Sequence, residues 1–398
     1  MSDNENNMPD RIRIGLPQMY KEPGEKRDFL PTFVAWLYKQ GAKVVLEHGY
    51  GSEMGYTEQD YLEAAPDIQF VPHKETYRQD YVLVLRYPTD DEIRLMHPGA
   101  CLLCMLHFPT RPQRVALLRS LDLEAISLDA LVDDSGRRLI ENLRAVGWNG
   151  VEAAFKTLRR IYPEPGFESP NRPPIQVTLL GAGAVGSHVV QAAIRYGNED
   201  LRRKLAAAGV PGVRVNVLDY DITPYEEIMR DVLARTDILV DATQRPDPSV
   251  PVIPNDWIAW MPEHAVLLDL SVDPYNCLIE PYYMKGIEGI PQGNLDKFIF
   301  TPEDPAYEDV PACIPKTNRR HAVSCYSWPG IYPKACMEVY GRQLRPIMHV
   351  LIEKGGIGNI NPNGRFFERA IARAQLTRWS SPGNAYPNKN AVNQKSVR

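Results

Sequence analysis

A glycine-rich turn between an apolar strand and a helix constrains the fold of this chain more than any other feature. Residues 175–180 are largely apolar and partly β-branched, and 185–196 follow a helical pattern. Between them lie the three glycines of a GxGxxG pattern, Gly181, Gly183 and Gly186. In such a turn the first glycine permits the sharp bend, the second admits a diphosphate to the backbone, and the third lets helix and strand pack closely. The context predicts a dinucleotide site with the diphosphate at the positive end of the helix.

The next predicted strand, 214–219, favours one dinucleotide over the other. It ends at Asp219, whose carboxylate suits hydrogen bonds from the ribose hydroxyls of the adenosine half and repels a 2′-phosphate. NAD is therefore preferred to NADP. Asp219 stands farther from the glycines than the usual spacing of about 20 residues. We interpret the polar stretch 198–212 as an insertion or an extended helix that absorbs the difference.

Further candidate contacts to the cofactor lie in the turn itself or directly after the predicted strand 238–241, at the same sheet edge. They are Val185, Ser187, Ala242 and Thr243. A glycine turn that binds nothing is the alternative, and the strand before the turn and the helix after it argue against that alternative.

Short β-like runs alternate with helical stretches along most of the chain. In the first part the predicted strands are 11–16, 43–47, 81–85, 100–106 and 123–127, and the helices between them are 31–40, 57–65, 89–96 and 111–121. In the second part the predicted strands are 175–180, 214–219, 238–241, 265–269 and one near 297–300. Regular alternation implies parallel strands joined by right-handed crossovers. The sequence thus predicts an α/β fold with two doubly wound parallel-sheet domains.

Other segments organise the chain around these two domains. A helical stretch at 137–162 follows the first domain, and the proline-rich segment 163–174 has the composition of a connection between domains. A second long helix is predicted at 333–354, where two glycines close it, and a last one at 363–379. The polar tail from Ser380 is expected to be disordered.

Composition excludes several classes of function. With 45 basic and 50 acidic residues the formal net charge is −5, which gives no electrostatic footprint for nucleic acid. The apolar runs are far shorter than the roughly 20 residues needed to cross a bilayer, and residues 1–10 lack the features of a signal peptide. We therefore expect a cytoplasmic protein without a membrane partner. The six cysteines suggest neither a disulfide framework nor a metal site, and Cys101 and Cys104 are interpreted as small hydrophobes on a buried strand.

Charged and titratable side chains follow the strands of the first domain. Arg27 lies after the first strand, Arg86 after another, and His107 after a third. Ligands of open α/β sheets gather at the carboxyl ends of strands, so the three are expected to converge on one cleft. Guanidinium groups hold carboxylates in a bidentate manner, and histidine exchanges protons near neutral pH. A solvated arginine and a packed histidine are the plain alternatives.

One acidic residue of the second domain is a candidate for the same cleft. Asp273 comes shortly after the predicted strand 265–269 and would face the nicotinamide side of the cofactor. An aspartate that only caps its own loop is the alternative.

Together these motifs resemble the family of alanine dehydrogenases and pyridine nucleotide transhydrogenase alpha subunits, which also includes the lysine-forming saccharopine dehydrogenases. The similarity runs from about Ile12 to Gly355. It is carried by Ile14-Gly-Leu-Pro with the following Lys21-Glu-Pro-Gly-Glu-Lys-Arg27, by 103–107, by Gly181–Gly186 and by 268–277.

The resemblance implies an architecture with one domain inserted into another. A catalytic domain would be built from residues 1–160 and 305–398, and an NAD-binding Rossmann domain at 165–304 would lie between them in the sequence. The active site would lie in the cleft between the domains, where closure excludes water. Relatives form homo-oligomers, which the resemblance also implies for this chain.

The resemblance further implies roles for the candidate residues. Arg27 would bind the substrate carboxylate, His107 would transfer the proton, and Asp273 would position or activate water or substrate. A hydride would pass between the substrate Cα and the nicotinamide of NAD. The chain would then be an NAD-dependent oxidoreductase acting on CH-NH2 or CH-NH donors, which interconverts an L-amino acid and a 2-oxo acid.

Arg86 departs from the family pattern, because relatives that act on alanine or saccharopine place a lysine there. Arginine does not lose its proton at accessible pH, so Arg86 suits a carboxylate clamp or a carbonyl polariser better than an acid–base role. A second carboxylate on the substrate or a different amine would fit. The alternatives are an opine- or saccharopine-type reductase that joins a 2-oxo acid to an amino acid, and a non-catalytic NAD(H)-binding protein.

Overall fold

The computed structural model describes residues 12–19 and 22–380, which form two compact units. The first unit contains Glu25–Glu141, the described residues before 20, and those from Tyr332 to 380. The second contains Glu22–Gly24 and Asn142–Ile331. The tail after Ser380, which was predicted to be disordered, lies outside the described residues.

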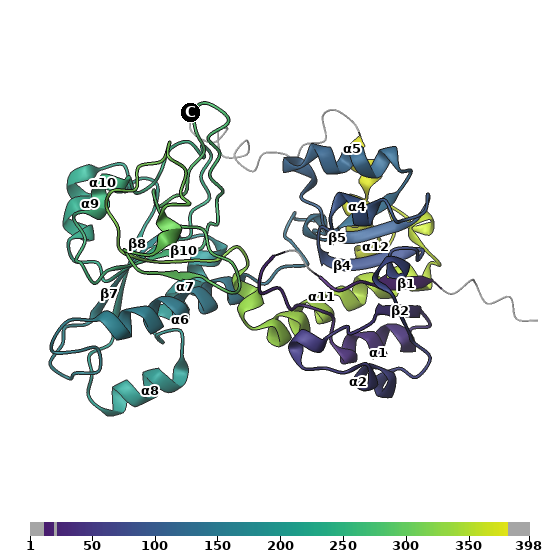
Figure 1. The fold of residues 1–398 in the computed structure, drawn as a ribbon, viewed down its shortest axis with the longest axis horizontal. Coiled ribbons are helices and arrows are strands. Elements are labelled where there is room, and N and C mark those ends of the chain that lie inside the picture. Colours follow the sequence, from purple (N-terminus) through teal and green to yellow (C-terminus); the bar gives the residue numbers. More distant parts are fainter. Residues whose placement is uncertain (1–11, 20–21, 381–398) are drawn as a thin grey trace, which may run out of the picture. The chain divides into compact units, whose positions relative to one another are not determined.

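The first unit is built on a six-stranded parallel sheet with the strand order β3-β2-β1-β4-β5-β6. The strands are β1 (Arg13–Leu16), β2 (Lys43–Glu47), β3 (Gln69–Val71), β4 (Tyr81–Arg86), β5 (Cys101–Met105) and β6 (Glu124–Ser127). The helices are α1 (Pro31–Lys39), α2 (Glu58–Ala64), α3 (His73–Thr76), α4 (Asp90–Ile93), α5 (Pro112–Ser120), α11 (Pro333–Glu353) and α12 (Phe366–Ala374). Figure 1 shows α1 and α5 on opposite sides of this sheet. Because the strand order reverses between β1 and β4, the carboxyl ends of these two strands flank the switch point where ligands of such sheets bind.

Local sequence explains where several of these helices begin. Thr57 and Thr89 each accept a hydrogen bond from the backbone three residues on, and Asp60 and Glu92 bond back to the capping residue. Pro31 occupies the first position of α1, where its missing N–H costs nothing. Each of these helices starts within one residue of its predicted start.

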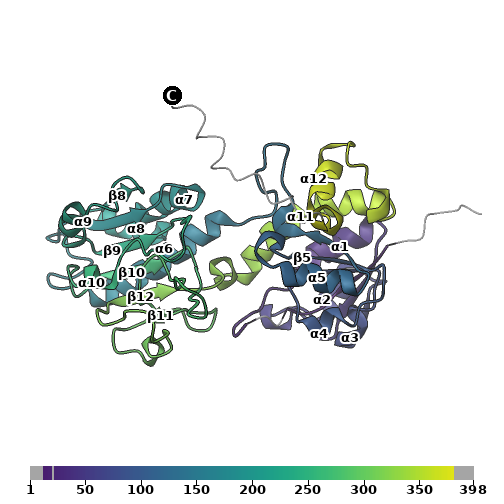
Figure 2. The ribbon, with the colours of Figure 1, turned by 90° about the horizontal axis from the view of Figure 1, so that it is seen from above.

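The second unit is built on another six-stranded sheet, ordered β11-β12-β10-β9-β7-β8, and Figure 2 shows these strands side by side from β8 to β11. The strands are β7 (Ile175–Leu180), β8 (Val213–Leu218), β9 (Ile238–Asp241), β10 (Val266–Asp269), β11 (Ile299–Phe300) and β12 (His321–Ser324). The helices are α6 (Leu143–Ile161), α7 (Ala184–Ala193), α8 (Glu199–Ala207), α9 (Glu226–Leu233) and α10 (Asn255–Ile258). All neighbours pair in parallel except β11 and β12, which are antiparallel. The predicted fold class, α/β with two doubly wound sheets, is confirmed, and the edge strand β11 is the one antiparallel member among the described strands.

The boundaries of the units differ from the predicted 1–160, 165–304 and 305–398. Helix α6 packs on α7 and on β10, so the second unit begins at Asn142 rather than at 165. Strand β12 pairs with β10 and extends the second unit to Ile331. No element was predicted at β12, because this strand lies in the proline- and arginine-rich stretch that precedes α11.

The segment 163–174, predicted to connect domains, is part of the second unit. Phe167 is buried in its core, and the guanidinium of Arg172, which is also buried, donates to the backbone carbonyl of Phe167 and to the hydroxyl of Tyr196. These hydrogen bonds and the surrounding aromatic rings hold the proline-rich segment against α6 and the turn that follows α7, which composition alone does not reveal.

Three further expectations need correction. The helix predicted from 137 starts at Leu143 and is continuous to Ile161, and its Gly147 and Gly150 let α6 approach His188 and Leu270 closely. The stretch 198–212 forms a separate helix, α8, which accounts for the long spacing to Asp219. Cys277 and Cys313 are joined in a disulfide, a pairing that their separation of 36 residues did not suggest.

Each unit has its own apolar core. The first core joins strands β1–β6 to α1 and to Met337, Leu344 and Ile347 of α11. In the second unit two clusters cover opposite faces of the sheet, because alternate residues of β7, β9 and β10 point to opposite sides. Cys101 and Cys104 lie buried on β5, as small hydrophobes do.

Candidate active site and cofactor turn

Arg27 and Arg86 come together at the carboxyl edge of the first sheet, around a third charged residue. The buried guanidinium of Arg27 donates from Nε to Oε1 of Glu25 at 2.7 Å, and its Nη2 contacts Oε2 of the same carboxylate. Nη1 of Arg86, the last residue of β4, lies 3.7 Å from Glu25 Oε2. Burial opposes the charge of Arg27, but the hydrogen bond and the charge of Glu25 raise the pKa of its guanidinium above the usual value. Two guanidinium groups thus share one carboxylate.

The accessibility of the two arginines differs. The side chain of Arg27 is 2% exposed and already holds Glu25 in a bidentate manner, whereas that of Arg86 is 25% exposed. A substrate carboxylate therefore reaches Arg86 more readily than Arg27 in this conformation.

His107 is held by a carboxylate that the sequence did not single out. The Nδ1 atom of His107 lies 3.3 Å from Oδ2 of Asp129, and the backbone N–H of His107 donates to Oδ1 of Asp129 at 3.1 Å. Ser127, at the end of β6, donates its hydroxyl to the same Oδ1. Burial alone would raise the pKa of Asp129, but the hydrogen bonds and charge of His107 outweigh it and hold the pKa well below its usual range.

The geometry of the His107–Asp129 pair suits proton transfer. The ionised Asp129 accepts a hydrogen bond from Nδ1 and thereby favours the tautomer whose lone pair is on Nε2. The side chain of His107 is 48% exposed. The signal that would have found Asp129 is its place two residues after β6, at the same sheet edge as His107.

The glycine turn of the second unit has the geometry of a diphosphate cradle. Gly181 adopts φ 88°, and an added Cβ there would lie 2.9 Å from the carbonyl oxygen of Ala242. At Gly186 a Cβ would come within 2.2 Å of the carbonyl oxygen of Gly181, so helix α7 packs on the turn only because residue 186 is glycine. Gly183, the N-cap of α7, has no other atom within 4 Å of its ideal Cβ position. The exposed backbone at Gly183 and the first turn of α7 therefore leave room for an anionic group.

The remaining predicted cofactor residues surround this turn. Asp219 follows β8 directly and is exposed, and it is adjacent to the turn because Gly181 N–H donates to the carbonyl of Leu218. Ala242 and Thr243 follow β9, the neighbour of β7 on its other side, so they lie at the switch point of this sheet. Val185 packs partly into the core, while the hydroxyl of Ser187 donates to the carbonyl of Ala184.

Asp273 forms an ion pair in the loop after β10. Its Oδ2 lies 2.7 Å from Nη2 of Arg245, whose side chain is 6% exposed and also donates to the carbonyl of Val250. Asp273 itself is 35% exposed. The structure thus places Asp273 near the carboxyl ends of β9 and β10, fixed by Arg245.

A buried polar network below this loop was not predicted. Nζ of Lys285 lies 2.7 Å from Oδ2 of Asp269, and both side chains are 1% exposed. Asp241 is linked to Asp269 through the hydroxyl of Ser271, and burial together with the charge of Asp269 raises the pKa of Asp241 to about 6. Lys285 lies in an irregular segment without periodicity, so no local pattern pointed to it. The network ties the segment after β10 to the carboxyl ends of β9 and β10.

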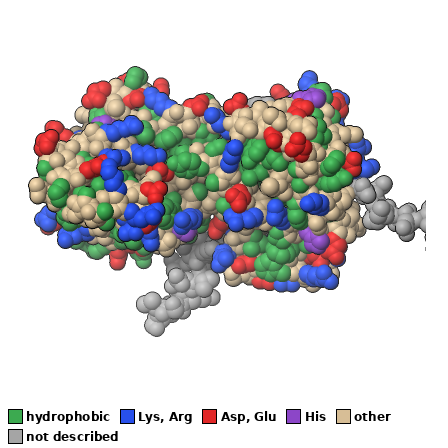
Figure 3. All heavy atoms as spheres, turned by 90° about the horizontal axis from the view of Figure 1, so that it is seen from below, with side chains coloured by type: hydrophobic (Ala, Val, Ile, Leu, Met, Phe, Trp, Pro, Cys, Tyr) green, Lys and Arg blue, Asp and Glu red, His purple; other side chains and the backbone are tan. Residues whose placement is uncertain are grey.

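Three further properties of the described residues concern membrane spans, metal ligands and surface charge. No helix within the described range has both the length and the apolar character needed to cross a membrane. The same residues contain no group of three or more histidine, cysteine or acidic side chains arranged to hold a metal ion. On the face drawn in Figure 3, basic side chains are mixed with acidic ones.

The fold and these residues define an α/β protein with a Rossmann-like unit and a second doubly wound unit, which carries an exposed histidine and two arginines at the same edge of its sheet. A family model described as the N-terminal domain of alanine dehydrogenase/PNT matches residues 17–144. Together with the relatives described below, this match supports the resemblance expected from the motifs: the chain is similar to members of the alanine dehydrogenase and pyridine nucleotide transhydrogenase family.

Curated relatives are distant in sequence. The alanine dehydrogenase of Bacillus subtilis is 22% identical over 273 residues, which are 65% of this chain and 70% of that protein. The NAD(P) transhydrogenase subunit alpha of Haemophilus influenzae is 25% identical over 188 residues, which are 46% of this chain. The matched part spans only 36% of that subunit.

Solved structures share the fold over nearly the whole chain. An L-alanine dehydrogenase superposes with a TM-score of 0.69 at 19% identity and covers 92% of this chain and 94% of its own. A transhydrogenase from Sinorhizobium meliloti gives a TM-score of 0.62 at 16% identity, covering 90% and 97%. At these identities the likeness establishes the fold.

Proposed function

We propose that the chain is an NAD(H)-dependent oxidoreductase that interconverts an L-amino acid and a 2-oxo acid in the manner of an alanine dehydrogenase. The observation that carries the proposal is the His107–Asp129 pair, which lies at the same sheet edge as Arg86 and Arg27. The match of residues 17–144 to the family model, the similarity to alanine dehydrogenases and the glycine turn support the oxidoreductase class and the cofactor.

NAD(H) fits the residues of the second unit. The open space at Gly183 and the N-terminus of α7 suit the diphosphate, and the exposed carboxylate of Asp219 suits the ribose hydroxyls while it repels a 2′-phosphate. When bound, the nicotinamide supplies or accepts the hydride.

The side chains of the first unit perform the remaining steps. Arg86 holds the substrate carboxylate through its two-pronged guanidinium, and Arg27 keeps Glu25 in place beside it. Nε2 of His107 takes the proton from the amine or hydroxyl of the intermediate, and in the reverse direction returns it. Asp129 fixes the tautomer and stabilises the imidazolium that forms. Asp273, fixed by Arg245, positions water or substrate from the second unit.

A second candidate function follows from the charge around Glu25. Arg27 and Arg86 both contact this one carboxylate, and the forked donors of arginine suit a further carboxylate on the substrate. A reductase that joins a 2-oxo acid to an amino acid, as opine- and saccharopine-type enzymes do, has such a substrate.

The test is NADH oxidation with a panel of 2-oxo acids, each combined with ammonium or with an amino acid such as lysine, ornithine or glutamate. Turnover that requires ammonium supports the amino-acid dehydrogenase, and turnover that requires an amino acid supports the reductase. NADH binding without turnover in any combination contradicts both and favours a non-catalytic NAD(H)-binding protein.

Two variants separate catalysis from cofactor binding. His107→Ala is expected to lower kcat by about 10²-fold or more and to leave NADH affinity unchanged, while His97→Ala, an exposed histidine of the same unit, should behave like the wild type. Asp219→Ala is expected to weaken NADH binding and to reduce the preference over NADPH, with Asp221→Ala as the exposed control. If His107→Ala keeps wild-type turnover, the catalytic assignment is wrong.

A further inference from the structure

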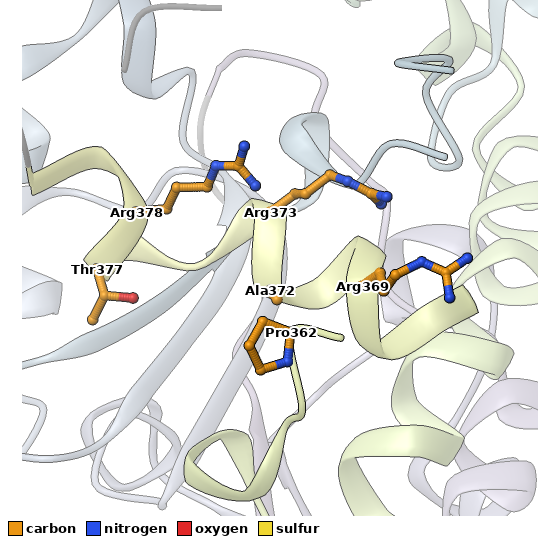
Figure 4. Close-up of a pocket in the computed structure, with 6 residues that line it drawn as sticks. All are labelled: Pro362, Arg369, Ala372, Arg373, Thr377 and Arg378. Carbon is orange, nitrogen blue, oxygen red and sulfur yellow. The ribbon is translucent and has the colours of Figure 1, made fainter. Parts of the chain in front are cut away.

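Two features lie outside the machinery of the proposed reaction, a pocket in the first unit and the disulfide in the second. The pocket, of about 340 Å³, lies on α12 and the 3-10 turn η7 (Leu376–Ser380). Figure 4 shows Arg369 and Arg373 extending from α12 beside it. Both guanidinium groups contact Asp134, and each also donates to a backbone carbonyl. These arginines thus serve the unit itself, and the disulfide is the stronger candidate for a second functional site.

Cys277 and Cys313, which form the disulfide, differ from the other cysteines in exposure. Both are partly exposed, and their Cα atoms lie 6.5 Å apart, within the range that disulfides adopt. The other four cysteines are buried: Cys101, Cys104, Cys325 and Cys336. Thiol–disulfide exchange requires access to the sulfur atoms. The disulfide is therefore the place where a small-molecule thiol can react with this chain.

The disulfide holds a segment that apolar burial does not hold. None of residues 276–284 is buried, and Leu278 at the tip of the segment is 96% exposed. Asn276 and Tyr283 exchange two backbone hydrogen bonds of 3.0 Å, which close the tip on itself. Exposed backbone hydrogen bonds and few buried contacts are typical of segments with low local stability. The position of the tip therefore depends on the disulfide.

Cys313, in contrast, belongs to a segment that is anchored in the second unit. The next residue, Ile314, is buried. Nζ of Lys316 donates to the carbonyl oxygens of Tyr307 and Val310 at 2.9 Å and 2.8 Å, and both of these residues are buried. The disulfide thus ties an unburied tip to a segment that the core holds in place.

The base of the segment carries Asp273, the candidate catalytic residue of the second unit. Nη2 of Arg245 contacts both Oδ2 of Asp273 and the carbonyl oxygen of Met284, so Arg245 joins the two ends of the segment. Cys277 lies four residues after Asp273, within the loop that Arg245 closes. A displacement of the tip therefore acts on the contacts that position Asp273.

We infer that Cys277 and Cys313 are a redox-active pair, which exchanges with small-molecule thiols and disulfides and controls the order of residues 274–283. A thiolate such as that of glutathione attacks one sulfur of the disulfide, forms a mixed disulfide and releases the other cysteine, which takes up a proton. A second glutathione thiolate attacks the glutathione sulfur of the mixed disulfide and releases the second protein thiol. The protein gains two electrons and two protons, and two glutathione molecules are oxidised to one disulfide.

The first experiment equilibrates the full chain with defined ratios of reduced to oxidised glutathione and identifies the alkylated cysteines of the folded protein by mass spectrometry. Neither Cys277 nor Cys313 should be alkylated in excess oxidised glutathione, and both should be alkylated in excess reduced glutathione. Cys101→Ala removes a buried thiol of the first unit and is the matched control, which should respond as the wild type does.

Two results of this titration overturn the inference. A disulfide that stays intact in the folded protein under excess reduced glutathione is structural. A pair that stays reduced under excess oxidised glutathione does not exchange at all.

The second experiment measures hydrogen exchange of the amides of Asn276, Leu278 and Tyr283, which donate hydrogen bonds within the tip. Exchange should be about tenfold faster in the reduced protein than in the oxidised one. Cys277→Ser and Cys313→Ser should exchange at the rate of the reduced protein in either glutathione mixture. Equal exchange in the two redox states of the wild type overturns the control of segment order.

A consequence for catalysis rests on the proposed function. Because Asp273 is less well positioned in the reduced state, kcat should fall about tenfold on reduction, and both serine variants should match the reduced protein. A kcat that is equal in the two redox states overturns the link between the disulfide and Asp273. Absence of turnover in both states instead contradicts the proposed function, while alkylation and hydrogen exchange still decide the inference.

Discussion

His107 adopts a left-handed backbone conformation, with φ 52°, that a non-glycine residue rarely keeps without support. The support comes from Asp129, which accepts hydrogen bonds from both the backbone and the ring of His107. One carboxylate thus fixes the position of the histidine and its tautomer together. Strain that persists beside an exposed titratable group is typical of functional sites.

Replacing Asp129 by Asn tests this arrangement. An amide cannot stabilise the imidazolium and does not enforce protonation at Nδ1, so kcat is expected to fall by about 10²-fold while NADH affinity stays unchanged. The measurement is steady-state turnover together with NADH binding by fluorescence. Asp133→Asn, an exposed turn residue nearby, is the control and should keep the wild-type kcat. A kcat for Asp129→Asn within threefold of the wild type would show that the pair is structural only.

Asp241 gives a second prediction at the scale of one residue, because burial raises its pKa from 3.8 to about 6. The folded state then binds more protons than the unfolded state between these two values, so stability falls as the pH rises through this window. Asp241→Asn removes this titration and keeps the acceptor for Thr243, while its amide group takes the place of the oxygen that accepts from Ser271. Between pH 5 and pH 7 the wild type should lose about 1 kcal/mol more of its unfolding free energy than the variant does.

Urea unfolding of both proteins at the two pH values measures that difference. Asp247→Asn replaces an exposed aspartate of the same unit and should keep the pH dependence of the wild type. An Asp241→Asn variant with the full wild-type pH dependence would assign the titration to other groups.

At the scale of elements, alanine at two positions of the glycine turn is expected to have different effects, one on NADH binding and the other on stability. Gly183→Ala places a methyl group in open space, so the protein should keep its stability, yet NADH should bind about tenfold more weakly because the methyl group lies where a diphosphate approaches. Gly186→Ala forces a Cβ against the carbonyl oxygen of Gly181 and should destabilise the second unit by about 1–3 kcal/mol. Thermal unfolding and NADH titration of the two variants separate these effects, and equal behaviour of the pair would contradict the assigned roles.

Sequence patterns predict the bounds of some strands well and miss other strands. Strands β2, β7 and β9 have the predicted bounds, because buried parallel strands are continuous apolar runs bordered by polar or glycine residues. Strands β3 and β12 were missed. Each is only three or four residues long and depends on pairing with a strand distant in the sequence, so no local periodicity marks it.

Candidate site residues also divide into those that the predicted strands locate and those that they do not. Positions at strand ends, such as Arg86 and His107, follow from the predicted strands alone. Their partners Glu25 and Asp129 do not, because ion pairs depend on which strand ends become neighbours, and this is decided by the strand order of the sheet. Lys285 is the extreme case, since its carboxylate partner lies on β10 while Lys285 itself lies in an irregular segment.

For the whole molecule, the two units differ in how they are built from the chain. Apart from Glu22–Gly24, the second unit is one continuous stretch, Asn142–Ile331, and all six strands of its sheet lie within that stretch. The core of the first unit instead combines strands β1–β6 with α11, which lies beyond residue 332. A continuous unit with its own core is expected to fold alone, and a discontinuous one is not.

The fragment 142–331 should therefore fold cooperatively and bind NADH with an affinity close to that of the full chain. It contains the glycine turn, Asp219 and Thr243, and its two apolar clusters are formed by its own residues. The fragment 1–141 should not fold cooperatively, because Met337, Leu344 and Ile347 of α11 are missing from its core, and deleting buried side chains of this size costs about 2–5 kcal/mol each. Circular dichroism with thermal unfolding, and NADH titration of the first fragment, measure both outcomes. A folded 142–331 that fails to bind NADH would place essential cofactor contacts in the first unit, and a cooperatively folded 1–141 would show that α11 is not part of its minimal core.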